Sequence, residues 1–262
     1  MLNIAIIQLQ LDDRESRAER IRRVEEHFSL LAGEAVQPQV VVLPEIWATG
    51  FFNFDRYHRE SEPLDGEIFS MLAPWAEKIG CYIVGGSIIE QGDQAYYNTS
   101  LVIDPTGSLA GTYRKIHLFG YQAEESRLLQ AGKEPLVLKT EFGTWGFSTC
   151  YDLRFPELYR FMVDGGTDLF FVVAAWPRAR LEHWVLLNRT RALENLGNLC
   201  ACNCSGTIRG TELGGNSLVV DPWGEVKARG GLQEEIIRVD VNPGLPGAVR
   251  RKFPALSDRR LR

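Results

Sequence analysis

Three residues that could together perform nucleophilic chemistry each lie just after a predicted strand. Glu45 follows VVVLP, Lys115 follows GTYR, and Cys150 follows WGFST. Ligands in open α/β sheets bind outside the carboxyl ends of strands, so these side chains can converge although they are distant in sequence. A cysteine attacks carbon as its thiolate, which a neighbouring ammonium favours, and a carboxylate can accept the proton. The lysine can also stabilise the oxyanion of a tetrahedral intermediate, helped by a backbone N–H after the nucleophile.

Each of these residues also has an ordinary structural interpretation. Buried cysteines commonly act as small hydrophobic core residues, Glu45 could cap the segment that follows it, and Lys115 could be a solvated strand end. The combination favours chemistry, because a base, a cation and a thiol are sufficient for acyl transfer from an amide. A Cys-His thiol protease would need a histidine instead, and His117 could share a face with Lys115 in an extended segment. A non-catalytic binding scaffold is the remaining alternative.

Hydrophobic periodicity predicts the elements that would position these residues. NIAIIQL and VVVLP are typical of buried strands, and the apolar residues from Ile21 to Leu31 recur between them at helical spacing. A second helical stripe runs from Ile68 to Ile79 and ends at Gly80, followed by the strand CYIVGGSII. After Cys150 the pattern predicts a helix from about Pro156 to Gly165, the strand DLFFVVAAW, a helix carrying Trp184, Leu187 and Leu193, and the strand LCACNCS.

A short repeat suggests that the chain has two related halves. SLVIDPTG at 100–107 matches SLVVDPWG at 217–224, and each copy is predicted to form the turn of a hairpin. No linker divides the halves, so we expect one α/β domain over residues 1–262, with two sheets sandwiched between helices. Residues 241–262 are rich in Pro, Gly and Arg and are expected to run over the surface or onto a partner subunit.

Composition limits the class of protein. The 262 residues carry a net charge of -5 with scattered basic residues, which argues against a nucleic-acid partner. No stretch could span a bilayer, and the first residues do not have the pattern of a signal peptide, so we expect a cytoplasmic protein without a membrane partner.

The cysteines are expected to be reduced thiols. There are five, an odd number, at positions 81, 150, 200, 202 and 204. The period of two in CACNC predicts a core strand and does not have the CxxC spacing of a zinc site. The sequence therefore predicts no metal at this segment.

At this point the sequence resembles the nitrilase, or carbon-nitrogen hydrolase, superfamily. The matching motifs are VVLPEIWATGF, YRKIHLFG and CYDLRFPELYR. The resemblance implies a four-layer α-β-β-α sandwich with internal pseudo-symmetry, a homodimer, and neither metal nor organic cofactor. It also implies that Glu45 is the general base, that Lys115 and the N–H of Tyr151 hold the oxyanion, and that Cys150 forms a thioester. A supporting glutamate is implied in YQAEESRLLQAG, where Glu125 matches better than Glu124.

The substrate is expected to be a small amide that bears a carboxylate. Arg154 lies four residues after Cys150 and could either grip a carboxylate or pair with Glu157. The segment AAWPRARLEHW offers Trp176 and Arg178 as pocket residues, with Arg180 a weaker candidate. These motifs look most like the omega-amidase group, which hydrolyses the terminal amide of 2-oxoglutaramate and similar dicarboxylic monoamides. An N-carbamoyl amino acid amidohydrolase, an aliphatic amidase and a nitrilase remain as alternatives with the same three residues.

Overall fold

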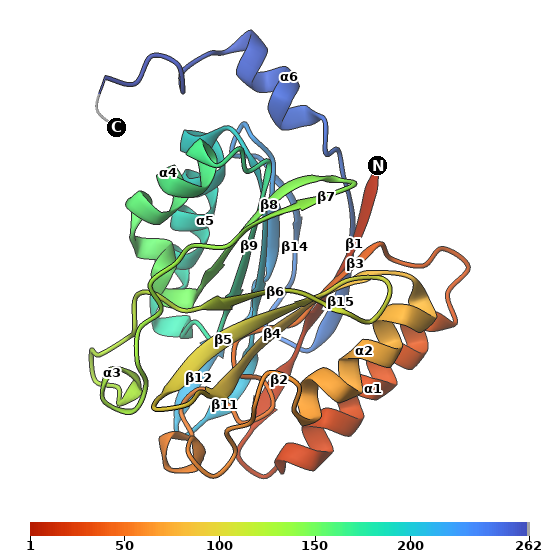
Figure 1. Cartoon of the computed structure of the whole chain (residues 1–262), viewed down its shortest axis with the longest axis vertical. Helices are drawn as coiled ribbons and strands as arrows, with labels where there is room; N and C mark the ends of the chain where they lie inside the picture. Colours follow the sequence, from red (N-terminus) through yellow and green to blue (C-terminus); the bar gives the residue numbers. More distant parts are fainter. Residues whose placement is uncertain (261–262) are drawn as a thin grey trace.

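The computed structural model describes residues 1–260 and has four layers (Figure 1). Two six-stranded sheets face each other, α1 and α2 cover the outer face of one, and α4 and α5 cover the outer face of the other. One apolar core lies between the sheets and continues under α4 and α5, and a second lies between the first sheet and α1 and α2. The expected α-β-β-α sandwich is confirmed.

The first sheet has the order β15-β1-β3-β4-β5-β6, and the second has the order β14-β13-β10-β9-β8-β7. The strands of the first are β1 (Leu2–Gln8), β3 (Val40–Val42), β4 (Tyr82–Gln91), β5 (Tyr96–Ile103), β6 (Leu109–Arg114) and β15 (Glu235–Val241). Those of the second are β7 (Val137–Thr140), β8 (Gly143–Thr149), β9 (Leu169–Ala174), β10 (Asn198–Asn203), β13 (Leu218–Val220) and β14 (Val226–Arg229). A small third sheet joins β2 (Gln10–Asp12), β11 (Ser205–Ile208) and β12 (Thr211–Gly214).

The helices connect these strands. The α-helices are α1 (Arg17–Ala32), α2 (Glu67–Ile79), α3 (Glu125–Leu128), α4 (Pro156–Asp164), α5 (Leu181–Asn195) and α6 (Leu245–Lys252). Three short 3₁₀ turns are η1 (Phe54–Arg56), η2 (Cys150–Arg154) and η3 (Arg178–Arg180). Within residues 1–260, no helix combines the length and the apolar character needed to cross a membrane.

The two halves repeat the same topology. Strands β1, β3 and β4 are parallel and are connected through α1 and α2, and strands β8, β9 and β10 are parallel and are connected through α4 and α5. An antiparallel hairpin then extends each sheet, β5–β6 in the first and β13–β14 in the second. The repeated turns have the same geometry, since Gly107 has φ 77° and Gly224 has φ 76°, the left-handed region that favours glycine. The sequence repeat therefore marks an internal pseudo-symmetry.

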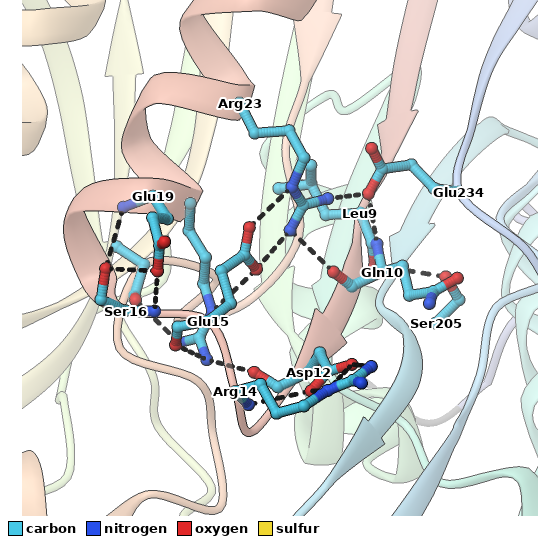
Figure 2. A network of polar contacts seen from close by, with 12 residues as sticks. Leu9, Gln10, Asp12, Arg14, Glu15, Ser16, Glu19, Arg23, Ser205 and Glu234 are labelled. Atoms are coloured by element: carbon cyan, nitrogen blue, oxygen red, sulfur yellow. Dashed lines mark hydrogen bonds and ion pairs between the residues drawn. The ribbon is translucent and has the colours of Figure 1, made fainter.

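A polar network fixes the start of α1 against the strands (Figure 2). Ser16 caps the helix in a reciprocal pair of hydrogen bonds with Glu19. One turn further, Arg23 pairs with Glu15 at 2.6 Å and with Glu234, which lies just before β15. The contact with Glu234 joins α1 to a distant part of the chain, and the wide hollow at this place is lined by five acidic and three basic side chains.

Two elements differ from the sequence-based expectation. The buried face of α5 is mostly polar, with Asn188, Arg191 and Asn195, whereas Leu193 points outward and is exposed. The C-terminal segment contains α6, which the Pro- and Gly-rich sequence did not predict, and its Val249 is buried. Residues 261 and 262 of the expected surface tail lie outside the described residues.

Candidate active site

A buried group of charges forms the floor of the candidate site. The Lys115 ammonium donates to Glu45 Oε1 at 2.8 Å and to both oxygens of Glu125 at 2.9 and 3.0 Å, and all three side chains are fully buried. Lys115 directly follows β6, Glu45 lies three residues beyond the end of β3, and Glu125 begins α3. Glu124 is instead exposed and pairs with Arg127. The structure therefore brings three of the expected site residues together, with Glu125 in the group and Glu124 outside it.

Asn98 holds the two carboxylates in place. Its Nδ2 donates to Glu45 Oε1 and to Glu125 Oε1, each at 2.8 Å. The other oxygen of Glu45 accepts the backbone N–H of Ala175 at 2.9 Å, and the other oxygen of Glu125 accepts that of Phe119 at 2.7 Å. Because every carboxylate oxygen has a donor, both glutamates are fixed in orientation.

Cys150 lies at the sharp end of β8. Its φ of 51° is in the left-handed region, which costs a residue with a side chain of order 1–3 kcal/mol and is typical of functional turns. Asp152 stabilises this turn, since its buried carboxylate accepts the backbone N–H of Thr149 at 3.0 Å. The same carboxylate accepts the hydroxyl of Tyr113 at 2.7 Å and the backbone N–H of His117 at 2.9 Å. Asp152 thus ties the cysteine turn to the segment that carries Lys115.

The resting thiol of Cys150 is protonated. Burial raises its pKa well above the usual value, Glu45 raises it further, and Lys115 lowers it by less. For Lys115, burial alone would lower the pKa, but Glu125 and Glu45 outweigh it and raise the pKa, so the amine is an ammonium. Burial also raises the pKa of Glu125 despite the opposing effect of Lys115. Lys115 thus favours the thiolate, as expected from the sequence, but burial and Glu45 outweigh this single cation until a base removes the proton.

A pocket leads from the surface to Cys150. Its aromatic walls are Phe51, Phe52, Phe119, Tyr151 and Trp176, and it also contains Ala175, Pro177 and two arginines, Arg154 and Arg180. The Arg154 guanidinium lies 4.9 Å from the centroid of the Trp176 ring and donates to His183 Nδ1 at 3.2 Å. The alternative pairing of Arg154 with Glu157 is not seen among residues 1–260.

Arg178 does not line this pocket. It is exposed and pairs with Glu212, whereas Arg180, two residues later, contributes to the wall. His117 is also directed elsewhere, because its ring stacks on Phe155 at 3.7 Å and its Nδ1 pairs with Asp152 at 2.7 Å. Of the expected pocket residues, Tyr151, Arg154 and Trp176 are thus brought to Cys150 and Arg178 is not.

Asn98 and Asp152 were not anticipated from the sequence. The sequence contained a signal for both. Asp152 lies two residues after Cys150 in a motif, and Asn98 is a polar residue in a predicted strand. Their partners come from other strands, however, and single-sequence periodicity does not give those pairings.

Four of the five cysteines are core residues in the structure. Cys81, Cys200, Cys202 and Cys204 are free and fully buried, whereas Cys150 is 7% exposed. Cys200 and Cys202 lie in the core strand β10, as expected for CACNC, and Cys204 directly follows it. Within the described part of the chain, no group of three or more His, Cys, Asp or Glu side chains is arranged to hold a metal ion.

The chain belongs to the carbon-nitrogen hydrolase family, whose profile matches residues 3–251, and it is a hydrolase of carbon–nitrogen bonds other than peptide bonds. It is 39% identical to a 2-oxoglutaramate amidase of Paenarthrobacter nicotinovorans, over 99% of this chain and 90% of the relative. It is 32% identical to the omega-amidase NIT2 of Danio rerio, over 98% of this chain and 94% of the relative.

Solved structures agree with this assignment. The crystal structure of Saccharomyces cerevisiae Nit3, a member of the nitrilase superfamily, has a TM-score of 0.90 at 28% identity, covering 99% of this chain and 97% of that chain. A CN-hydrolase superfamily protein from Xanthomonas campestris has a TM-score of 0.91 at 29% identity, covering 100% of this chain and 98% of that chain. Its structure carries an arsenic adduct in the active site.

Proposed function

We propose that the protein is an omega-amidase that hydrolyses the terminal amide of a small carboxylate-bearing substrate, such as 2-oxoglutaramate or succinamate, to the acid and ammonia. The observation that carries the proposal is that Cys150 interacts with Glu45 and Lys115 of the Glu45–Lys115–Glu125 cluster and lines a pocket that contains two arginines. The names of the relatives from Paenarthrobacter nicotinovorans and Danio rerio support the same substrate class.

The first half of the reaction forms a thioester. Since the resting thiol is protonated, attack requires proton transfer, and Glu45 takes the Cys150 proton as the sulfur bonds to the amide carbon. The oxygen of the tetrahedral intermediate is stabilised by the Lys115 ammonium and by the backbone N–H of Tyr151. The C–N bond then breaks, and the nitrogen leaves as ammonia with the proton returned by Glu45.

The second half hydrolyses the thioester. Glu45 removes a proton from water, the hydroxide adds to the acyl carbon, and the C–S bond breaks with return of the proton to the sulfur. Glu125 is a positioning residue, because its contact is with Lys115 through two hydrogen bonds. No step requires a metal or an organic cofactor, since the proton transfers and charge stabilisation are supplied by side chains and backbone.

Ammonia release from a panel of amides tests the function. The panel contains 2-oxoglutaramate, succinamate, glutamine, an N-carbamoyl amino acid and a simple nitrile, each with the wild type and Cys150→Ala. We expect rapid, Cys150-dependent release from the two dicarboxylic monoamides. Preference for the N-carbamoyl compound or the nitrile would replace the omega-amidase proposal with one of those activities. Turnover by the Cys150→Ala variant would contradict the thioester mechanism.

We also propose that the protein is a homodimer that associates through the outer face of α4 and α5 together with the C-terminal segment 241–262. Large apolar side chains are exposed there, with Phe161 at 59%, Leu186 at 63% and Leu193 at 49%. Trp223 and Phe253 extend this surface, with ring centroids 6.1 Å apart, and Figure 1 shows α6 beyond one end of the sandwich. Sedimentation should give twice the chain mass, and Leu186→Glu should give a monomer.

The remaining proposals concern domain organisation and location. We propose a single domain over residues 1–262 that works in the cytoplasm, supported by a core shared between both halves and by five free thiols. Limited proteolysis should leave one resistant fragment, and cell fractionation should recover the protein with cytoplasmic markers.

A further inference from the structure

We propose that Arg180, together with Arg154, binds the substrate carboxylate and thereby makes the enzyme select anionic monoamides over neutral amides. The inference rests on the proposed function and assigns its substrate selection to a particular side chain. It differs from the sequence-based expectation, which favoured Arg178.

Both guanidiniums lack a counter-charge. Among residues 1–260, no carboxylate lies within ion-pair distance of Arg154 or Arg180, and each is instead placed against an aromatic ring of the pocket wall. Nearby arginines are neutralised, since Arg178 pairs with Glu212 and Arg191 pairs with Glu194 at 2.7 Å. The mostly aromatic pocket therefore contains two unpaired cations, which favours binding of an anionic ligand.

Arg180 is held at the pocket by its backbone. Its carbonyl oxygen accepts the indole N–H of Trp176 at 2.8 Å, and its N–H donates to the carbonyl of Pro177 at 3.0 Å. The side chain is half-buried, and its guanidinium lies 5.5 Å from the centroid of Phe119. The anchoring atoms belong to residues of the pocket wall, so the guanidinium can turn toward a bound carboxylate while the main chain of Arg180 stays fixed.

The chemistry of the two guanidiniums explains why the pocket binds a carboxylate and disfavours a neutral amide. A guanidinium binds a carboxylate through two parallel hydrogen bonds, and these are strengthened where aromatic walls exclude water. A neutral amide in the same pocket leaves two like charges partly desolvated without a partner. Discrimination by such a site is large, because the wrong substrate leaves buried polar groups unsatisfied.

Arg178 provides a matched control for Arg180. The two arginines lie in the same 3₁₀ turn, two residues apart, but only Arg180 lines the pocket. The variants are Arg180→Gln and Arg178→Gln. The substrates are succinamate and its neutral isostere succinamide, which differ only in the group at the far end.

Arg180→Gln should lower kcat/KM for succinamate about tenfold to a hundredfold, mainly through KM, as expected for lost charge-assisted hydrogen bonds. It should change kcat/KM for succinamide by less than about threefold, and Arg178→Gln should leave both substrates unchanged. With succinamide as substrate, succinate should inhibit the wild type more strongly than Arg180→Gln. This second readout measures carboxylate binding without relying on turnover of the anion.

The possible results separate the proposed function from the role of Arg180. If the wild type turns over succinamate through Cys150 but Arg180→Gln leaves its kcat/KM and succinate inhibition unchanged, the proposed function stands and the role of Arg180 is wrong. An equal loss on both amides also contradicts that role, because it indicates general damage to the pocket. If the wild type hydrolyses neither succinamate nor 2-oxoglutaramate, the proposed function fails and the inference fails with it.

Discussion

Replacing Lys115 by methionine removes the cation that lies between two buried carboxylates. In the wild type the ammonium is within 2.8–3.0 Å of Glu45 and Glu125, and water reaches none of the three side chains. Methionine has a similar length but no charge, so the folded variant must either bury two unbalanced carboxylates or protonate one of them. Removing one partner of a buried ion pair typically costs about 3–5 kcal/mol.

The cost of protonation gives the magnitude and its pH dependence. Keeping one glutamate neutral at pH 7 costs about 4 kcal/mol, from an ordinary pKa of about 4.3 and about 1.4 kcal/mol per pH unit. At pH 5 the same step costs about 1 kcal/mol. The folded variant then binds one more proton than its unfolded chain above the unfolded pKa, so its free energy of unfolding falls as pH rises.

Urea unfolding at pH 5 and pH 7 measures this effect. We expect Lys115→Met to be less stable than the wild type by about 1 kcal/mol at pH 5 and by about 4 kcal/mol at pH 7. The double variant Lys115→Met/Glu125→Gln should recover stability at pH 7, because only one carboxylate remains. Lys139→Met, at the exposed position of the edge strand β7, is the control and should change stability by less than about 0.5 kcal/mol. An equal loss at both pH values would refute the charge-balance argument in favour of lost packing.

Three further predictions concern the geometry around the nucleophile. Iodoacetamide should label Cys150 before the four fully buried cysteines, and because burial raises its pKa the rate should keep rising above pH 9; peptide mass spectrometry measures both. Asp152→Asn should lower the free energy of unfolding by about 3 kcal/mol in urea titrations, since an amide has one acceptor oxygen where the carboxylate has two that accept four donors. Gly86→Ala should reduce both stability, by about 2 kcal/mol or more, and kcat for succinamate, because Gly86 has φ 69° and a Cβ there would lie 1.9 Å from the carbonyl of Pro44, which precedes Glu45.

The fold was largely predictable because its signals are local. Helical stripes, the glycine at 80 that ends α2 and the repeated Asp-Pro-X-Gly turn all depend on residues close in sequence. The buried face of α5 was not predictable, because hydrophobic periodicity treats asparagine positions as exposed. Asn188 and Asn195 are buried, and their side-chain amides donate to carbonyls of their own helix. Tertiary packing thus reversed the expected orientation of Leu193.

The reacting side chains were predictable from the sequence, but the residues that hold them in position were not. Glu45, Lys115 and Cys150 each follow a strand, so their convergence is a consequence of topology. Asn98 reaches the two glutamates from β5, and that contact depends on how strands of one sheet align with segments far away. The choice between Arg178 and Arg180 depends on the rotation of a single 3₁₀ turn, which sequence spacing alone does not determine.

The two halves of the pseudo-symmetric domain contribute differently to the site. The first supplies Glu45 and Lys115, and the second supplies Cys150 from the end of β8, so the chemistry depends on how the two sheets face each other. Both pocket arginines, in contrast, come from the second half, on the turns η2 and η3 near the surface. Within residues 1–260, neither arginine side chain bonds to Glu45, Lys115 or Glu125, so substrate selection can be altered at Arg154 and Arg180 without removing a contact of the Lys115 cluster. Because of this separation, the Arg180 and Lys115 variants are independent tests. The Arg180 variant tests which substrate binds, and the Lys115 variant tests what holds the reacting groups in place.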